Sequence, residues 1–187
     1  MSDTKPDIVR RLCEAVVRRL RPPRVIYDRL GRSPYLSRWY LLGGPRTDGE
    51  AFDQHGATLP GVVFQNLPIN IYVHRFHRSD DDSALHNHPW RWSVSFILAG
   101  GYTEERRDDT DPGDGYGRVV TREVRPGSVN VIRDSDFHRV DLLEHDAWSI
   151  FVAGPKSGSW GFWDRWTGEY LPWREFIGKL RQQDAEC

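Results

Sequence analysis

Cysteine is scarce in this 187-residue sequence, which contains only Cys13 and Cys187. The two residues have neither the spacing of a zinc site nor that of a disulfide framework. A disulfide-stabilised secreted domain is therefore not indicated. Residues 1–6 also lack the apolar core and the small-residue cleavage site of a secretory signal. We expect a cytoplasmic protein.

An excess of either charge is also missing, as are long apolar runs. The 26 Lys and Arg residues are balanced by 27 Asp and Glu residues, which gives a net charge of −1. This balance argues against a general attraction to nucleic acid or to anionic membranes. No run of about 18 apolar residues, the length of a membrane-spanning helix, is present. We expect neither nucleic acid nor a membrane as a partner.

Aromatic residues are present in quantity. They make up 12% of the chain and include 8 Trp. Because aromatic side chains bury large areas, they can form a compact core despite the 28% charged content. The length suits one well-buried domain rather than two. We therefore predict a single domain over residues 1–187, with a helical extension at 1–24, a β-barrel at 25–168, and a C-terminal helix and tail at 169–187.

Two segments have a helical period. Residues 7–20 carry an apolar residue every four positions and stop before Pro22, which predicts an amphipathic helix on the outside of the domain. Near the other end, residues 172–180 place apolar side chains on one helical face, which predicts a short C-terminal helix. The first stripe is Ile8, Leu12, Val16 and Leu20, and the second is Trp173, Phe176, Ile177 and Leu180.

Between these helices the pattern is that of many short strands. Apolar stretches of strand length alternate with Gly, Pro and Asp, which predicts an all-β sandwich or barrel. Gly100-Gly101 is a signal for a hairpin turn, and residues 108–117 are polar and Gly-rich, as expected of an exposed loop. The predicted strands are residues 35–42, 61–64, 70–76, 92–99, 119–124, 128–132, 148–153 and 160–163.

The most informative histidines form the pair His86-Asn87-His88. In a strand, residues i and i+2 face the same side, with Cα atoms roughly 7 Å apart. Two neutral imidazoles placed in this way can converge on one iron, copper, nickel or zinc ion. Pro89 and Trp90 follow at once and end the strand.

The surroundings of this pair resemble the first cupin motif, in which Gly precedes His-x-His and a Glu and a Gly follow. Here Asp80 stands at the first Gly position, Ser93 at the Glu position, and Gly100 at the final Gly position. The segment from Gly127 to His138 resembles the second motif, since both of these residues are retained at the expected spacing. Other residues occupy its remaining positions: Arg133, Ser135 and Leu142.

The resemblance covers roughly residues 70–154. A longer string is similar to a group of cupin proteins from bacteria and phages: His-Asn-His-Pro-Trp, Gly-Gly-Tyr-Thr-Glu, Pro-Gly-Ser-Val, His-Arg-Val and Trp-Gly-Phe. It implies an all-β, jelly-roll-like cupin barrel that holds one divalent metal through His86, His88 and His138. Because a Ser hydroxyl is a poor ligand, Ser93 is expected to point at the metal cavity without binding the ion.

Three histidines without a carboxylate resemble the ferrous site of the thiol dioxygenases. This resemblance implies Fe(II), with zinc, nickel or manganese as alternatives, and a ferrous oxygenase acting on a small anionic or chelating substrate. A metal-dependent isomerase or lyase is a second hypothesis. A non-enzymatic cupin that binds a ligand or a partner, as a homodimer, is a third. A shared barrel does not by itself transfer a reaction.

Three further residues are candidates to orient the substrate: Tyr102, Glu104 and Arg75. Glu104 is about 13 Å along the strand pair from Ser93 if the hairpin forms, which favours a supporting role over metal ligation. Its alternative is an ion pair with Arg106 or Arg91. Arg75 could bind a carboxylate or phosphate if it faces inward, and could otherwise pair with the acidic run at residues 80–82.

Overall fold

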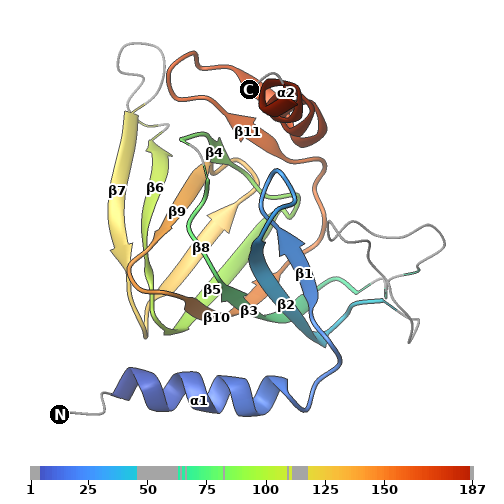
Figure 1. Ribbon diagram of the computed structural model, residues 1–187, viewed down its shortest axis with the longest axis vertical. Helices are drawn as coiled ribbons and strands as arrows, with labels where there is room; N and C mark the ends of the chain where they lie inside the picture. Colours follow the sequence, from blue (N-terminus) through green and yellow to red (C-terminus); the bar gives the residue numbers. More distant parts are fainter. Residues whose placement is uncertain are drawn as a thin grey trace.

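The structure is a computed structural model that describes residues 5–45, 63, 65, 67–81, 83–108, 110 and 118–185. Two six-stranded antiparallel sheets face each other, with one helix at each end of the assembly (Figure 1). The elements are α1 (Lys5–Val17), β1 (Arg24–Tyr27), β2 (Pro34–Leu42), β3 (Asn70–Phe76), β4 (Leu85–His86), β5 (Trp92–Ala99), β6 (Tyr102–Asp108), β7 (Arg118–Val124), β8 (Val129–Arg133), β9 (His138–Leu142), β10 (Ala147–Ala153), β11 (Gly161–Trp163), β12 (Tyr170–Pro172) and α2 (Trp173–Ala185).

The strand order is that of a jelly roll. The first sheet has the order β1-β2-β3-β10-β5-β8, and the second has β12-β11-β4-β9-β6-β7. From β3 to β10 the chain crosses repeatedly between the sheets, so that four strands of each form the closed core of a double-sheet jelly roll. The predicted all-β, jelly-roll-like barrel with terminal helices is confirmed. The sheet continues to Pro172, however, so β12 lies inside the segment 169–187 that was predicted to be helix and tail.

The predicted hairpin at Gly100-Gly101 is wrong. These glycines join β5 in the first sheet to β6 in the second, and Glu104 lies opposite Arg122 of β7 and Val140 of β9 rather than Ile97. Both glycines have positive φ, 70° and 130°. A Cβ on Gly100 would lie 2.0 Å from the carbonyl oxygen of Asp146. Glycine is therefore required here for a tight crossing between sheets rather than for a hairpin.

Most predicted strands are present within a residue of their expected bounds, with β3 and β5 matching at both ends. The predicted strand at 61–64 and most of the predicted loop at 108–117 lie outside the described residues. The sequence patterns missed β1, β9 and β12, and they indicated β4 and β6 only indirectly, through the His86–His88 pair and the expected turn at Gly100-Gly101.

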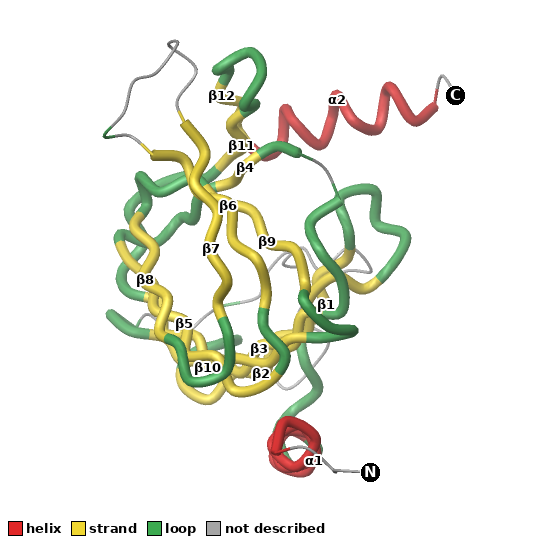
Figure 2. The backbone as a smooth tube through the Cα atoms, turned by 90° about the vertical axis from the view of Figure 1, so that its left-hand side faces the viewer, coloured by secondary structure: helices red, strands yellow, loops and turns green. Residues whose placement is uncertain are grey.

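Helix α1 covers the outer face of the first sheet, as Figure 2 shows from the side. Its packed residues are Val9, Cys13 and Val17, which contact a cluster that contains Trp39 and Trp148. The predicted apolar stripe of α1 instead faces outward, with Ile8, Leu12 and Val16 each more than half exposed. Two stripes with a four-residue period lie side by side on this helix, and periodicity alone does not distinguish them.

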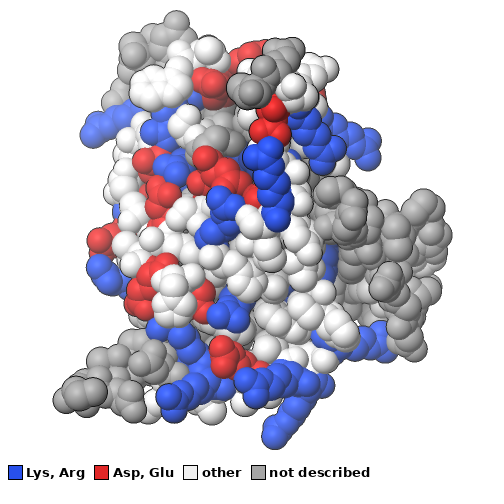
Figure 3. All heavy atoms as spheres, viewed as in Figure 1, with Lys and Arg blue, Asp and Glu red and all other residues white. Residues whose placement is uncertain are grey.

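Helix α2 packs through the predicted face against the second sheet. Phe176 stacks on Phe162 of β11 with ring centroids 4.1 Å apart, and Trp173 stacks on Trp160 at 5.8 Å. Within the described segments, neither helix combines the length and apolar character that crossing a bilayer requires. Basic and acidic side chains intermix over the face shown in Figure 3, in keeping with the balanced charge.

Candidate metal centre

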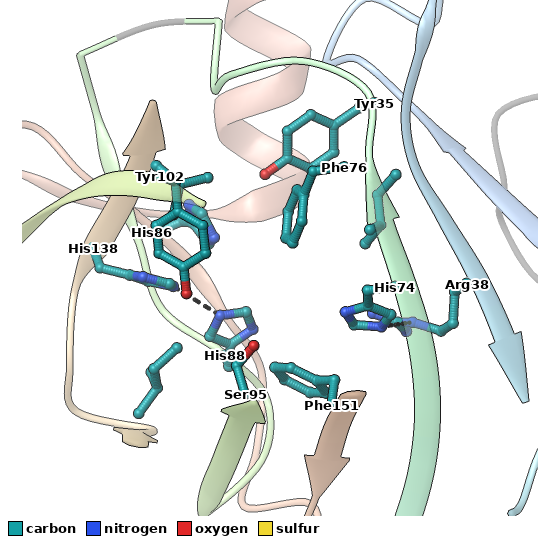
Figure 4. Close-up of a pocket in the computed structure, with 13 residues that line it drawn as sticks. Tyr35, Arg38, His74, Phe76, His86, His88, Ser95, Tyr102, His138 and Phe151 are labelled. Atoms are coloured by element: carbon teal, nitrogen blue, oxygen red, sulfur yellow. Dashed lines mark hydrogen bonds between the residues drawn. The ribbon is translucent and has the colours of Figure 1, made fainter. Parts of the chain in front are cut away.

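Three histidines meet at one end of the barrel interior. His86 of β4 and His138 of β9 are direct cross-strand partners, and His88 follows two residues after His86. The Nε2 atoms of His88 and His138 are 2.9 Å apart, and one ligand nitrogen from each residue lies within 4.8 Å of the others (Figure 4). Nitrogens that share one zinc ion at about 2.1 Å lie roughly 3–3.4 Å apart. The cluster therefore has the spacing of a metal site.

The position of His88 corrects one detail of the sequence analysis. β4 covers only Leu85 and His86, so His88 lies beyond the strand rather than on it. Asn87 holds the segment in place instead. Its side-chain oxygen accepts the backbone N–H of Gly161 at 2.9 Å, and its Nδ2 donates to the carbonyl of Asp134 at 2.7 Å. The middle residue of the His pair thus connects β4 to β11 and to the loop before β9.

The protonation of the cluster suits a metal. Burial, with the nearby His138, lowers the pKa values of His86 and His88 well below the usual range, so both rings are neutral. His138 directs Nδ1 at the Glu104 carboxylate, 2.9 Å away, and this hydrogen bond assigns the proton to Nδ1. The lone pair of His138 is then on Nε2, which faces His88. Neutral imidazole is the form that binds metals.

Glu104 is a completely buried carboxylate behind His138. It accepts hydrogen bonds from His138, from Asn130 at 2.8 Å and from Arg122 at 2.8 Å, and it also pairs with Arg106 at 3.1 Å. Burial opposes its ionisation, but the His138 hydrogen bond and the Arg106 charge outweigh that effect and hold the Glu104 pKa well below its usual range. Glu104 therefore both supports His138 and forms the alternative ion pair with Arg106.

A second carboxylate, Asp80, lies near His86. Its Oδ2 is 3.9 Å from His86 Nδ1 and accepts the backbone N–H of Val140 at 2.8 Å. The side chain is 5% exposed, so the first residue of the acidic run at 80–82 is buried beside the cluster. Asp81 does pair with Arg78 near the surface, and Asp82 lies outside the described residues.

The inward face of β5 carries Ser93, Ser95 and Ile97, all of them buried. Ser93 faces the barrel interior, but the expectation that it points at the metal cavity is wrong. Its hydroxyl lies 3.4 Å from the carbonyl of Ile132, and it is Ser95, two residues later, that lines the cavity beside the histidines. The cavity-lining serine is therefore displaced by one inward position.

Tyr102 and Arg75, two of the candidate substrate-binding residues, lie on opposite sides of the barrel wall. Tyr102 is buried, lines the cavity, and accepts a hydrogen bond from Asn130 Nδ2 at 3.1 Å. Burial raises the pKa of Tyr102 to about 12, so it keeps its proton. Arg75 lies on the outer face of β3, where it pairs with Asp146 at 3.0 Å and stacks on Trp148. Strand parity thus excludes Arg75 from the cavity, and its predicted role there is wrong.

The cavity beside the histidines has a volume of about 80 Å³. It is lined largely by aromatic and aliphatic side chains, with Arg38 and His74 on the side away from the cluster (Figure 4). Sequence analysis did not single out Arg38. Strand parity gave a partial signal for His74, because it shares a face with Tyr72 and lies opposite Arg75.

Trp90 is packed between the two ends of this site. His88 stacks on its ring with centroids 5.7 Å apart, and the Arg38 guanidinium lies 5.5 Å from the ring centroid. Trp90 is buried and also packs on Tyr72 and Phe151. It therefore forms a rigid wall that connects the histidine cluster to Arg38. Of the remaining histidines, His145 is largely exposed, and His55 lies outside the described residues.

Comparison with known proteins concerns the fold. No family model matches the sequence, and no curated protein matches it. Among solved structures, an oxalate oxidase in complex with glycolate is 15% identical with a TM-score of 0.40, over 51% of this chain and 46% of that one. The chain thus spans less than half the length of that oxidase.

Two other solved structures are also similar in fold. KdgF from Halomonas sp. is 16% identical with a TM-score of 0.41, over 67% of this chain and 84% of that one. The DMSP lyase DddQ from Ruegeria pomeroyi DSS-3 is 18% identical with a TM-score of 0.49, over 82% and 66%. Function has to be argued from the site itself.

Proposed function

We propose that this protein is a metal-dependent enzyme, a ferrous oxygenase that acts on a small anionic or chelating molecule. The observation that carries the proposal is the convergence of His86, His88 and His138 on a cavity that also contains Tyr102. A divalent ion held by the three imidazoles would supply a Lewis acid, and iron would add one-electron chemistry with dioxygen.

The charge of the site favours an anionic substrate. Within the described residues the cluster offers three imidazoles and no carboxylate, because Glu104 is turned to Nδ1 of His138 and is neutralised by Arg106 and Arg122. Three neutral ligands leave the full charge of a divalent ion uncompensated. A chelating anion such as a thiolate, carboxylate or enolate would balance this charge.

Cavity size and lining restrict the substrate further. A water-sized group occupies roughly 10–15 Å³ on this scale, so 80 Å³ accommodates only a molecule of a few non-hydrogen atoms. Phe76 and Phe151 line the cavity and make part of its wall apolar. Tyr102 retains its proton, and its hydroxyl can therefore donate a hydrogen bond to a substrate oxygen.

The test begins with metal analysis of protein purified without added metal. We expect stoichiometric iron, and we expect the ferrous protein to consume dioxygen in an oxygen electrode when a small thiol, diketone or hydroxy acid is supplied, without 2-oxoglutarate. Stoichiometric zinc, nickel or manganese with no uptake for any of these compounds would instead support a Lewis-acid isomerase or lyase. Substoichiometric metal would support the third hypothesis, a non-enzymatic protein that binds a ligand or a partner.

A further inference from the structure

The far end of the cavity contains a pair of cross-strand neighbours, Arg38 of β2 and His74 of β3. Arg38 Nε lies 2.9 Å from His74 Nε2. An arginine N–H can only donate, so His74 Nε2 must be the acceptor and the proton of the neutral ring must be on Nδ1. Arg38 thus fixes the tautomer of His74.

This tautomer leaves a buried donor without an acceptor. His74 is 2% exposed, and its Nδ1 has no hydrogen-bond partner within the described part of the chain. The hydroxyl of Ser149, the direct cross-strand partner of His74, is also buried and unpartnered there. Buried polar groups in folded proteins nearly always have partners. Two such groups side by side indicate a place where a ligand supplies the acceptor.

The charge of Arg38 has no carboxylate to balance it among the described residues. Its hydrogen-bond partners are His74 and Tyr40, and its guanidinium lies over the rings of Tyr72 and Trp90 at 4.7 and 5.5 Å. His74 itself is held between Tyr72 and Phe151, with ring centroids 5.6 and 4.7 Å away. A desolvated cation and a fixed N–H donor therefore occupy one rigid aromatic wall.

We propose that Arg38 and His74 form an anion-binding subsite that takes the carboxylate of a small substrate, with His74 Nδ1–H as the donor and Arg38 as the residue that positions it. The substrate would reach across the cavity, so that its other polar group approaches the three-histidine cluster (Figure 4). The approach of this second polar group to the histidines rests on the proposed function, whereas carboxylate binding by Arg38 and His74 does not require a metal.

The test is calorimetric titration of metal-free and metal-loaded protein with lactate, pyruvate and mercaptoacetate, and with the neutral analogue lactamide. We expect saturable binding of at least one carboxylate, and lactamide at least about tenfold weaker than lactate, because hydrogen bonds to charged partners are the stronger kind. The variant H74F keeps an aromatic ring between Tyr72 and Phe151, and it should weaken carboxylate binding by about tenfold or more with metal content unchanged.

The matched control is Arg75→Met, because Arg75 follows His74 in β3 and points to the opposite face of the sheet. The Arg75→Met variant should bind the carboxylate with wild-type affinity. Carboxylate binding by H74F at wild-type strength, equal binding of lactate and lactamide, or no binding of any carboxylate would each overturn the subsite. Failure of the wild type to retain metal would instead refute the proposed function, and titration of the metal-free protein would still decide this inference.

The positioning role of Arg38 has its own readout. Nitrogen-15 NMR of the His74 ring should show the Nδ1–H tautomer in the wild type and a shifted tautomer population in Arg38→Met. Carboxylate affinity should fall in the same variant and recover in part in Arg38→Lys, which keeps the charge but lacks the guanidinium fork. An unchanged tautomer together with unchanged affinity in Arg38→Met would refute this role.

Discussion

The two faces of the first sheet carry two arginine clusters with opposite surroundings. On the inner face, Arg38 donates to the neutral ring of His74 beside the cavity. On the outer face, Arg75 and Arg10 of α1 share the buried carboxylate of Asp146, with distances of 3.0 and 2.8 Å. The outer cluster is satisfied by the protein itself, whereas the inner one presents donors to a cavity.

This difference separates a structural cluster from a candidate binding site. Asp146 also accepts a hydrogen bond from the Trp148 indole at 2.9 Å, so it connects α1, β3 and β10 within the packed layer below the sheet. The charge of Asp146 is balanced by two arginines and its oxygens already accept three hydrogen bonds, so the protein itself satisfies this carboxylate. Chemistry is therefore expected only on the inner face, and each prediction below tests that division.

The largest effect is expected from the three histidines. Replacing His86, His88 or His138 singly by Ala should strip most of the bound metal, because each removes one of three ligands. Metal content after purification measures this. The control is His145→Ala, whose side chain is 72% exposed, and which should retain metal like the wild type. Full metal occupancy in His138→Ala would show that the cluster is not the metal site.

A substitution in the outer cluster should lower the stability of the fold and leave metal binding unchanged. Asp146→Ala leaves Arg10 and Arg75 without their shared partner, and breaking a buried ion pair typically costs about 3–5 kcal/mol of stability. Urea unfolding of the metal-free proteins measures the loss, while metal stoichiometry should stay unchanged. Asp141→Ala is the matched control, because Asp141 pairs with Arg139 and is 44% exposed. Equal unfolding curves for both variants would contradict the assigned role of Asp146.

A smaller effect is expected behind the metal cluster. Glu104→Gln keeps a hydrogen-bond acceptor for His138 but removes its charge, and loss of such an outer partner typically weakens metal affinity about 10–100-fold. Competition with a chelator measures the affinity on protein that circular dichroism shows to be folded. Glu123→Gln, in an exposed pair with Arg125, is the control. Wild-type affinity in Glu104→Gln would show that His138 does not depend on Glu104.

The smallest effect is a pH dependence of the outer cluster. Burial opposes ionisation of Asp146, but hydrogen bonds from Arg10 and Trp148 outweigh it and lower its pKa. A depressed pKa gives stability that is present above the unfolded value of about 4 and is lost as pH falls through the folded value. The neighbouring titratable groups are Glu144, His145 and His77.

The measurement compares the unfolding free energies of wild type and Asp146→Asn across this window. The gap between them should be constant near pH 6 and should shrink as pH falls below the unfolded value of about 4, because both proteins carry a neutral group at this position once Asp146 is protonated. A gap that stays the same over the whole range would mean that the charge of Asp146 does not contribute to docking α1.

The comparison of the two faces of the first sheet also shows which residues of the cavity could be predicted from the sequence. Strand alternation places Tyr72 and His74 on one face of β3 and Arg75 on the other, but it does not say which face points inward. Arg75 was predicted to bind a substrate carboxylate or phosphate because arginine is always charged. In the structure it instead pairs with Asp146, 71 residues later in the chain. Arg38 gave no local signal, since its importance depends on a cross-strand neighbour 36 residues away.

The sequence by itself determined the β-rich class, the strands β3 and β5 and the packed face of α2, because each follows from local spacing along one segment. The histidine set was implied by the resemblance to the two cupin motifs. Only the tertiary structure decided that Gly100-Gly101 crosses between sheets, that Ser95 rather than Ser93 lines the cavity, and that Arg38 faces it. These features depend on which strands become neighbours, and in a jelly roll those neighbours are far apart in the chain. Local periodicity carries no information about such pairings.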